Sequence, residues 1–111
     1  MNKNTAKLLL IFIILIIGSH SAWATKLRGR VVGYNSYYNS YYPASNILVV
    51  FKYWNRNSRS WVRAGQTHTQ RDGMFYIRLR PRDYYIQVPG KNVPLRVFRR
   101  QNQDIPEIQI R

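Results

Sequence analysis

The sequence of 111 residues contains no cysteine. No disulfide can stabilise the fold, although small exported domains often depend on disulfides. Cysteine nucleophiles, cysteine metal ligands and a lipid-modified cysteine anchor are excluded for the same reason. Acidic residues are nearly as scarce, since the chain has four of them: Asp72, Asp83, Asp104 and Glu107.

This scarcity argues against an enzyme. After residue 24 the only histidine is His68, and a catalytic triad needs a base with an acid and a nucleophile placed around it. Asp72 and Asp83 lie in turn-forming sequences, which explains them without catalysis. One histidine and four scattered acids do not supply a metal site. We therefore expect no catalytic residue, metal or cofactor, and we interpret His68 as a polar residue on a strand.

The first 24 residues have the organisation of a secretion signal. Lys3 and Lys7 precede an unbroken apolar run over residues 8–17, and Ala22-Trp23-Ala24 supplies the small residues that signal peptidase requires. The apolar run is too short for a membrane-spanning helix, which needs about 20 residues. We expect cleavage after Ala24 and export by the Sec route, to the periplasm or the medium, with residues 25–111 forming one domain.

Cations dominate the expected mature chain. The full sequence has 18 lysine and arginine residues and a net charge of +14, and loss of Lys3 and Lys7 would lower this to +12. Most of these cations are arginine, whose planar guanidinium binds phosphate, sulfate or carboxylate at two points. A domain this basic attracts polyanions. The alternative interpretation is that the charge only keeps the domain soluble and monomeric.

Hydrophobic periodicity after residue 24 is two rather than 3.6. Residues 75–80, for example, read FYIRLR, an alternation typical of a half-buried strand. Turn sequences such as residues 55–59 and the Asp72-Gly73 pair separate these segments. Pro94 and Pro106 cannot donate ladder hydrogen bonds, so the last two strands should be edges or be interrupted there. Seven strands are predicted, over residues 27–31, 47–53, 61–69, 75–80, 84–88, 93–97 and 108–110, which indicates an all-β sandwich. Its predicted core includes Phe75, Ile77, Leu79, Tyr84 and Ile86.

One segment does not follow the strand pattern. The sequence Asn-Ser-Tyr-Tyr occurs twice in succession, over residues 35–38 and 39–42. We interpret residues 34–42 as an exposed tyrosine-rich loop, because binding loops are rich in Tyr, Ser and Asn. The predicted partner-binding residues are Tyr34, Tyr37, Tyr38, Tyr41 and Tyr42. An equally good interpretation is that alternate tyrosines extend a strand and pack on the sandwich.

Four stretches resemble the carboxypeptidase regulatory-like domains, which belong to the transthyretin-like (prealbumin-like) β-sandwiches. Residues 27–31 (LRGRV) resemble their opening strand, and residues 43–49 (PASNILV) resemble the entry to the second. Residues 67–77 fit T-x-T-x-x-D-G-x-F-x-I, and residues 79–84 fit L-x-P-x-x-Y. Arg82 and Asn46 stand where the family has Gly usually or often, and the tyrosine repeat is foreign to the pattern. The resemblance implies a single seven-stranded antiparallel Greek-key sandwich without catalytic residues, serving as an accessory, adhesive or assembly module.

Strand alternation also predicts a basic surface. If the apolar residues of 75–79 face the core, Tyr76, Arg78 and Arg80 face outward together. The same reasoning turns Lys26, Arg28 and Arg30 outward. The predicted anion-binding residues are Arg28, Arg30, Arg78 and Arg80, with Arg96, Arg99 and Arg100 as a third basic group near the C-terminal strands.

Two functions remain open. One is a non-enzymatic binding module for an anionic polymer of the envelope or extracellular matrix: phosphorylated lipid headgroups, acidic polysaccharide or extracellular nucleic acid. The other is a structural module that docks a protein partner through a sheet edge and the tyrosine-rich loop. The salt dependence of binding distinguishes the two functions. Polyanion binding weakens steeply as the salt concentration rises, whereas a docked protein interface should weaken less.

Overall fold

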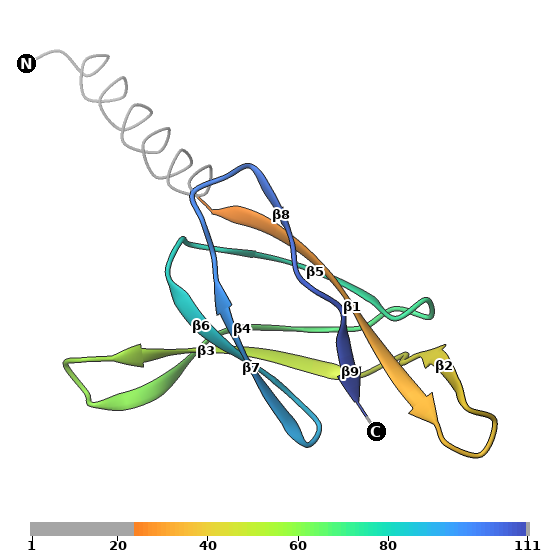
Figure 1. Ribbon diagram of the computed structural model, residues 1–111. Helices are drawn as coiled ribbons and strands as arrows, with labels where there is room; N and C mark the ends of the chain where they lie inside the picture. The colour runs from red at the N-terminus through yellow and green to blue at the C-terminus, as the bar shows by residue number, and fades with distance from the viewer. Residues whose placement is uncertain (1–23, 111) are drawn as a thin grey trace, which may run out of the picture.

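A computed structural model describes residues 24–110 (Figure 1). The predicted signal peptide lies outside the described residues, apart from Ala24. Residues 24–110 contain nine strands and no helix, and hence no helix that could span a membrane. The strands are β1 (Thr25–Asn35), β2 (Ser40–Pro43), β3 (Leu48–Asn55), β4 (Ser60–His68), β5 (Met74–Leu79), β6 (Asp83–Val88), β7 (Lys91–Arg96), β8 (Asn102–Asp104) and β9 (Ile108–Ile110).

The strands form two sheets. In the first sheet, the long strand β1 pairs with all the others: β5 and β8 along its first half, β2 and β9 along its second half. The second sheet is antiparallel throughout, with the order β4-β3-β6-β7. Pro94 lies in the edge strand β7, and Pro106 lies between β8 and β9. Both prolines therefore occupy the edge or interrupted positions that the sequence predicted.

The structure has nine strands where the sequence predicted seven. Each predicted segment contributes a strand, and the two additional ones are β2 and β8. The predicted antiparallel arrangement is also wrong in part, because β8 and β9 run parallel to β1. These pairings join opposite ends of the chain, and local periodicity carries no information about such contacts.

The hydrophobic core lies between the two sheets. Phe75 of the first sheet and Phe51 of the second are both fully buried, with ring centroids 6.2 Å apart. Of the predicted core residues, four are buried and Ile77 packs partly buried against them. The predicted strand faces are therefore confirmed. The main cluster comprises Leu27, Val31, Ala44, Val49, Phe51, Phe75, Leu79, Tyr84, Ile86, Val88, Leu95, Val97, Ile105 and Ile108.

Two connections show why the sequence turns where it does. At the predicted Asp72-Gly73 turn, the Asp72 carboxylate accepts a hydrogen bond from the Met74 amide at 3.0 Å. Gly73 has φ of 82°, and a Cβ there would lie 2.6 Å from the Val31 carbonyl oxygen, so glycine is required. Where β5 passes to β6, the buried Tyr84 donates its hydroxyl to the carbonyl of residue 80 at 2.6 Å. Burial raises the pKa of Tyr84.

Candidate functional site

The outward residues of β1 and β5 form a single face of the first sheet. The two strands are neighbours, and their register pairs Lys26 with Arg78 and Arg28 with Tyr76. All four side chains are exposed, as the alternation predicted. Arg30 follows on β1, and the exposed Arg80 lies just beyond the end of β5. The two basic surfaces expected from the sequence are therefore one continuous surface.

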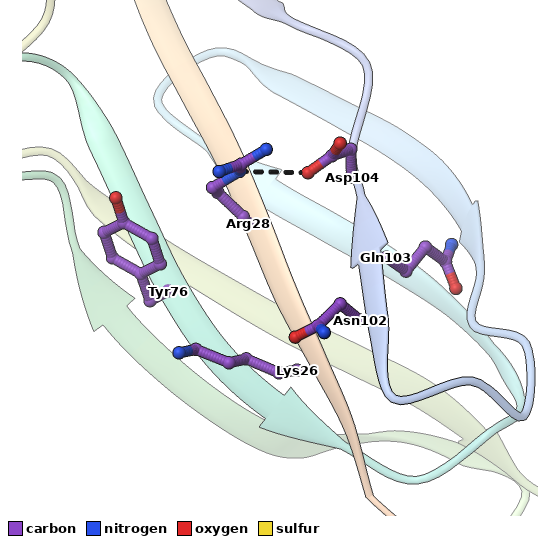
Figure 2. A pocket seen from close by; sticks show the side chains of 6 residues that line it. All are labelled: Lys26, Arg28, Tyr76, Asn102, Gln103 and Asp104. Carbon is purple, nitrogen blue, oxygen red and sulfur yellow. Dashed lines mark hydrogen bonds and ion pairs between the residues drawn. The ribbon is translucent and has the colours of Figure 1, made fainter.

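Two of the four predicted anion-binding residues already have protein partners. The Nε of Arg28 donates to Asp104 Oδ1 at 3.0 Å, across the β1–β8 pair (Figure 2). This hydrogen-bonded carboxylate raises the pKa of Arg28. The Nε of Arg30 donates to the carbonyl of Asp72 at 3.2 Å. Both guanidiniums are thus partly occupied before any ligand arrives.

The ion pair lies in a hollow of about 400 Å³ on this face, called here the mixed hollow. Figure 2 shows Arg28 reaching from β1 toward Asp104, while Tyr76 stands on β5 on the other side of β1. Cationic, anionic and amide groups all contribute to it, so its electrostatic preference is weak. Its lining residues are Lys26, Arg28, Tyr76, Asn102, Gln103 and Asp104.

A second hollow, of about 600 Å³, adjoins the mixed hollow and has a different character. We call it the basic hollow. Four of its lining residues are cations and none is an acid. The full lining consists of Ala24, Lys26, Arg78, Arg99, Arg100, Gln101 and Asn102. Of the predicted anion-binding residues it contains Arg78 alone. The sequence missed this grouping because Arg99 and Arg100 lie more than twenty residues after Arg78, in a loop that pairing with β1 brings back.

The loop that carries the basic hollow is tied firmly to β1. The buried Thr25 donates its hydroxyl to the carbonyl of Phe98 at 2.6 Å. The side-chain carboxamide of Gln103 accepts a hydrogen bond from the backbone N–H of Phe98 at 2.9 Å. Its NH₂ group donates to the backbone carbonyl of Arg96 at 2.8 Å. The guanidinium of Arg100 lies 5.1 Å from the centre of the Phe98 ring, within reach of a cation–π contact. The loop backbone is therefore ordered in advance, which lowers the entropic cost of binding.

The segment predicted as a loop, residues 34–42, is instead a β-hairpin. Tyr34 ends β1 opposite Tyr41 of β2, and residues 36–39 form the turn. The Asn35 carboxamide accepts a hydrogen bond from the Tyr37 amide at 3.0 Å, and Asn39 has φ of 50°. Asparagine tolerates this backbone region, which explains a tight turn without glycine.

The hairpin tyrosines do not share one surface. Tyr34 and Tyr41 contact each other across the strands with their rings tilted at 53° and centroids 5.1 Å apart. Tyr37 and Tyr38 meet edge to face at the tip, 5.0 Å apart. Tyr42 covers Gly33, where a Cβ would lie 2.2 Å from the ring. The strand interpretation of this segment is thus correct for the backbone. The tip rings do not pack on the sandwich, however, since Tyr37 and Tyr38 are 87% and 72% exposed.

Sequence reasoning also missed an aromatic cluster on the second sheet, formed by Trp54, Trp61 and Tyr85. Trp54 lies opposite Trp61 in the β3–β4 register, with ring centroids 5.5 Å apart. Trp61 then meets Tyr85 of β6 at 5.0 Å. All three side chains remain 42–48% exposed. The position of the two tryptophans on either side of the predicted hairpin loop 55–59 was a signal that could have revealed the pair.

Two hollows flank this aromatic cluster. The smaller, about 290 Å³, is lined by Lys52, Trp61, Tyr85, Gln87 and Asn92. The larger, about 410 Å³, is lined by Trp54, Arg56, Trp61, Arg82, Asp83, Tyr84 and Tyr85.

The acid in the larger hollow is engaged by an arginine. Asp83 Oδ1 accepts from Arg96 Nε at 2.8 Å, and this contact lowers the pKa of Asp83 and raises that of Arg96. Among residues 24–110, no three histidine, cysteine, aspartate or glutamate side chains come together as metal ligands would. The described surfaces present clustered cations at the basic hollow and partly exposed aromatic rings on the second sheet.

Comparison with known proteins yields a likeness in fold. No family model matches the sequence, and no curated protein matches it. A crystal structure of a 9R-lipoxygenase from Cyanothece PCC8801 is similar, with a TM-score of 0.56 and 14% sequence identity. The match covers 81% of this chain and 17% of the lipoxygenase chain. At this identity the likeness concerns the sandwich architecture alone.

Proposed function

We propose that the protein is a non-enzymatic exported module that binds an anionic polymer, and that the basic hollow is its main contact. The observation that carries the proposal is the lining of this hollow, where Lys26, Arg78, Arg99 and Arg100 converge without an acid. Convergent cations raise the local concentration of anions and speed their association. The ordered loop behind them supports binding rather than solubility alone as the purpose of the charge.

The chemistry of the basic hollow suits repeated phosphate, sulfate or carboxylate groups. Arginine forks such as that of Arg78 bind these groups at two points, whereas Lys26 contributes a mobile point charge. Ala24 lines the hollow, so cleavage after it would leave the new α-amino group of Thr25 at the rim. That group has an ordinary pKa of about 7.7–8.0 and would add positive charge near neutral pH. Removal of the signal peptide during export would then add a cation to the anion-binding site.

The family resemblance supports the non-catalytic part of the proposal. Residues 67–84 carry the most specific of the motifs that resemble carboxypeptidase regulatory-like domains, and they build the β4–β5 turn, β5 and the start of β6. Domains of that kind serve as accessory, adhesive or assembly modules. The proposed partners are accordingly polymers of the envelope or extracellular matrix, bound by surface charge without chemical conversion.

Salt dependence tests this proposal. A short DNA duplex serves as a polyanion of known charge spacing, and its dissociation constant is measured at several salt concentrations. The triple variant Lys26→Ser, Arg78→Ser, Arg100→Ser should bind more weakly. Its slope of log affinity against log salt should fall by about 0.9 for each phosphate that the variant no longer neutralises.

The control removes the same charge elsewhere. The triple variant Arg59→Ser, Arg71→Ser, Lys91→Ser changes three exposed cations outside the basic hollow. It should keep most of the affinity and slope. Equal reductions in both triple variants, or no binding by the wild-type protein at physiological salt, would reject the basic hollow as the site.

A protein partner is the second candidate, and the β1–β2 hairpin favours it. All four residues of β2 are exposed, and β2 pairs with β1 alone. An exposed edge strand can accept an additional strand from a partner. A photo-crosslinking residue in place of Tyr37 should then capture one protein at both low and high salt. Disappearance of the crosslink at high salt, or none at any salt, would reject protein docking at this tip.

A further inference from the structure

The aromatic cluster on the second sheet has no role in anion binding at the basic hollow. Trp54 and Trp61 alone would be explained as a cross-strand pair that stabilises the β3–β4 hairpin. Tyr85 lies outside that hairpin, on β6, yet its ring extends the cluster. Trp61 and Tyr85 line both neighbouring hollows, so together they form the wall between them. Each ring stays about half exposed, which leaves aromatic surface available to a ligand.

The polar groups around this wall suit a ligand rich in hydroxyls and carrying negative charge. In the smaller hollow, the side-chain amides of Gln87 and Asn92 can each donate and accept hydrogen bonds. Lys52 adds a positive charge beside them. In the larger hollow, two arginines accompany Asp83, the one acid among its lining residues, whose carboxylate already accepts from Arg96. The charge available to a ligand at both hollows is therefore positive.

We propose that this outer face of the second sheet binds an acidic polysaccharide, with one sugar ring on each side of the Trp61–Tyr85 wall. The apolar faces of the sugars pack on the aromatic rings. Their hydroxyl groups exchange hydrogen bonds with Gln87 and Asn92, and a carboxylate or sulfate pairs with Lys52. The site lies on the sheet opposite the basic hollow and uses a different chemistry, so it stands whether or not the basic hollow binds anions.

Single-stranded nucleic acid is the competing ligand, and the ring geometry disfavours it. Proteins that bind single strands present aromatic faces on which successive bases stack. Here neighbouring rings meet edge to face, at 68° for Trp54 and Trp61 and 81° for Trp61 and Tyr85. Consecutive bases would find no row of parallel faces. Sugars joined through single bonds can turn relative to each other and so meet rings of different orientation.

Tryptophan fluorescence gives a local readout. Of the three tryptophans in the sequence, Trp54 and Trp61 are the two that follow residue 24. The exported protein is titrated with an oligogalacturonate, a neutral malto-oligosaccharide and an oligothymidylate near physiological salt. Each titration is repeated in the Lys26→Ser, Arg78→Ser, Arg100→Ser background, which removes anion binding at the basic hollow. The oligogalacturonate should change the tryptophan emission saturably in both backgrounds. It should also bind more tightly than the other two ligands.

Variants of the wall complete the test. If a stacked sugar contributes as much as a stacked base, Trp61→Ala and Tyr85→Ala should each weaken binding by about 5- to 150-fold. Trp54 remains as the reporter in both variants, and Trp61→Phe should recover part of the affinity. Lys52→Gln should weaken binding of the charged oligosaccharide and leave the neutral one unchanged. Tyr37→Ser with Tyr38→Ser is the matched aromatic control and should have no effect.

Three results would overturn the proposal. One is the absence of any saturable emission change with the oligosaccharides. The second is wild-type affinity in both Trp61→Ala and Tyr85→Ala, with the fold intact by circular dichroism. The third is tighter binding of the oligothymidylate than of either oligosaccharide in the triple-variant background, which would make the surface a nucleic-acid site.

Discussion

Replacing Phe75 with alanine is expected to lower the free energy of unfolding by about 3–5 kcal/mol. The Phe75 side chain is fully buried, and its ring reaches Phe51 of the opposite sheet. Alanine would leave a cavity at the centre of the sandwich that neither sheet can close alone. Small domains have a total stability of about 5–15 kcal/mol, so this loss approaches unfolding. Phe75→Leu, which keeps more of the volume, should cost less and keeps the series measurable.

The contact between Phe75 and Gly29 makes this prediction sharper. The two residues are opposite each other in the β1–β5 register, and a Cβ at residue 29 would lie 2.3 Å from the tip of the ring. Gly29→Ala alone should therefore destabilise the domain by about 1–3 kcal/mol through overpacking. In the Phe75→Ala background the ring is gone, and Gly29→Ala should cost far less. The double-mutant cycle should show a coupling of about 0.5–3 kcal/mol.

Urea unfolding followed by far-UV circular dichroism supplies the four free energies of this cycle. The signal should be that of a β-protein, in keeping with strands throughout residues 24–110. A loss below about 1 kcal/mol for Phe75→Ala would mean that the side chain does not fill the core, contrary to its burial. Additive effects of the two substitutions would contradict the close contact between ring and glycine.

Three further predictions concern a hydroxyl, an ion pair and the mature terminus. Tyr84→Phe should cost about 1 kcal/mol in urea unfolding, because it removes the hydroxyl hydrogen bond to the Arg80 carbonyl. Since the folded-state pKa of Tyr84 is raised, its contribution should be fully present below pH of about 10 and be lost as pH rises through the higher folded value. Asp104→Asn should release Arg28 and remove a negative charge from the mixed hollow, so the affinity for a DNA duplex should rise in a salt titration. Unchanged affinity would mean that Arg28 takes no part in binding. Intact mass of the exported protein should show Thr25 as the first residue, and a membrane-retained full-length species would contradict this.

The sequence was a good guide to local structure. Alternation over residues 75–80 predicted which side chains are buried. The short turn predicted at Asp72-Gly73 is also present, with Gly73 in a positive-φ conformation that favours glycine. Asn46 has φ of 55°, in a backbone region that asparagine tolerates. These features depend on neighbours within a few residues, which is the range over which periodicity and turn chemistry act.

Features that depend on distant pairing could not be predicted. The parallel strands β8 and β9 are three residues each and gain their hydrogen bonds from β1. Their arrival beside β1 places Asp104 on Arg28 and Arg100 near Arg78, which changes the electrostatics of the whole face. The aromatic cluster likewise needs β6 beside β3 before Tyr85 meets Trp61. Composition predicted a basic surface, and the topology showed where four of its cations line one hollow.

A residue-resolved map of polyanion binding would show directly whether the basic hollow is the binding site. The isotope-labelled exported protein is titrated with a sulfated oligosaccharide, and amide chemical shifts are followed by NMR near physiological salt. The largest shifts should fall on the basic hollow, at Lys26, Arg78 and residues 99–102, with smaller shifts around Arg28 and Asp104. Shifts confined to the tyrosine hairpin, or spread evenly over all exposed arginines, would contradict it.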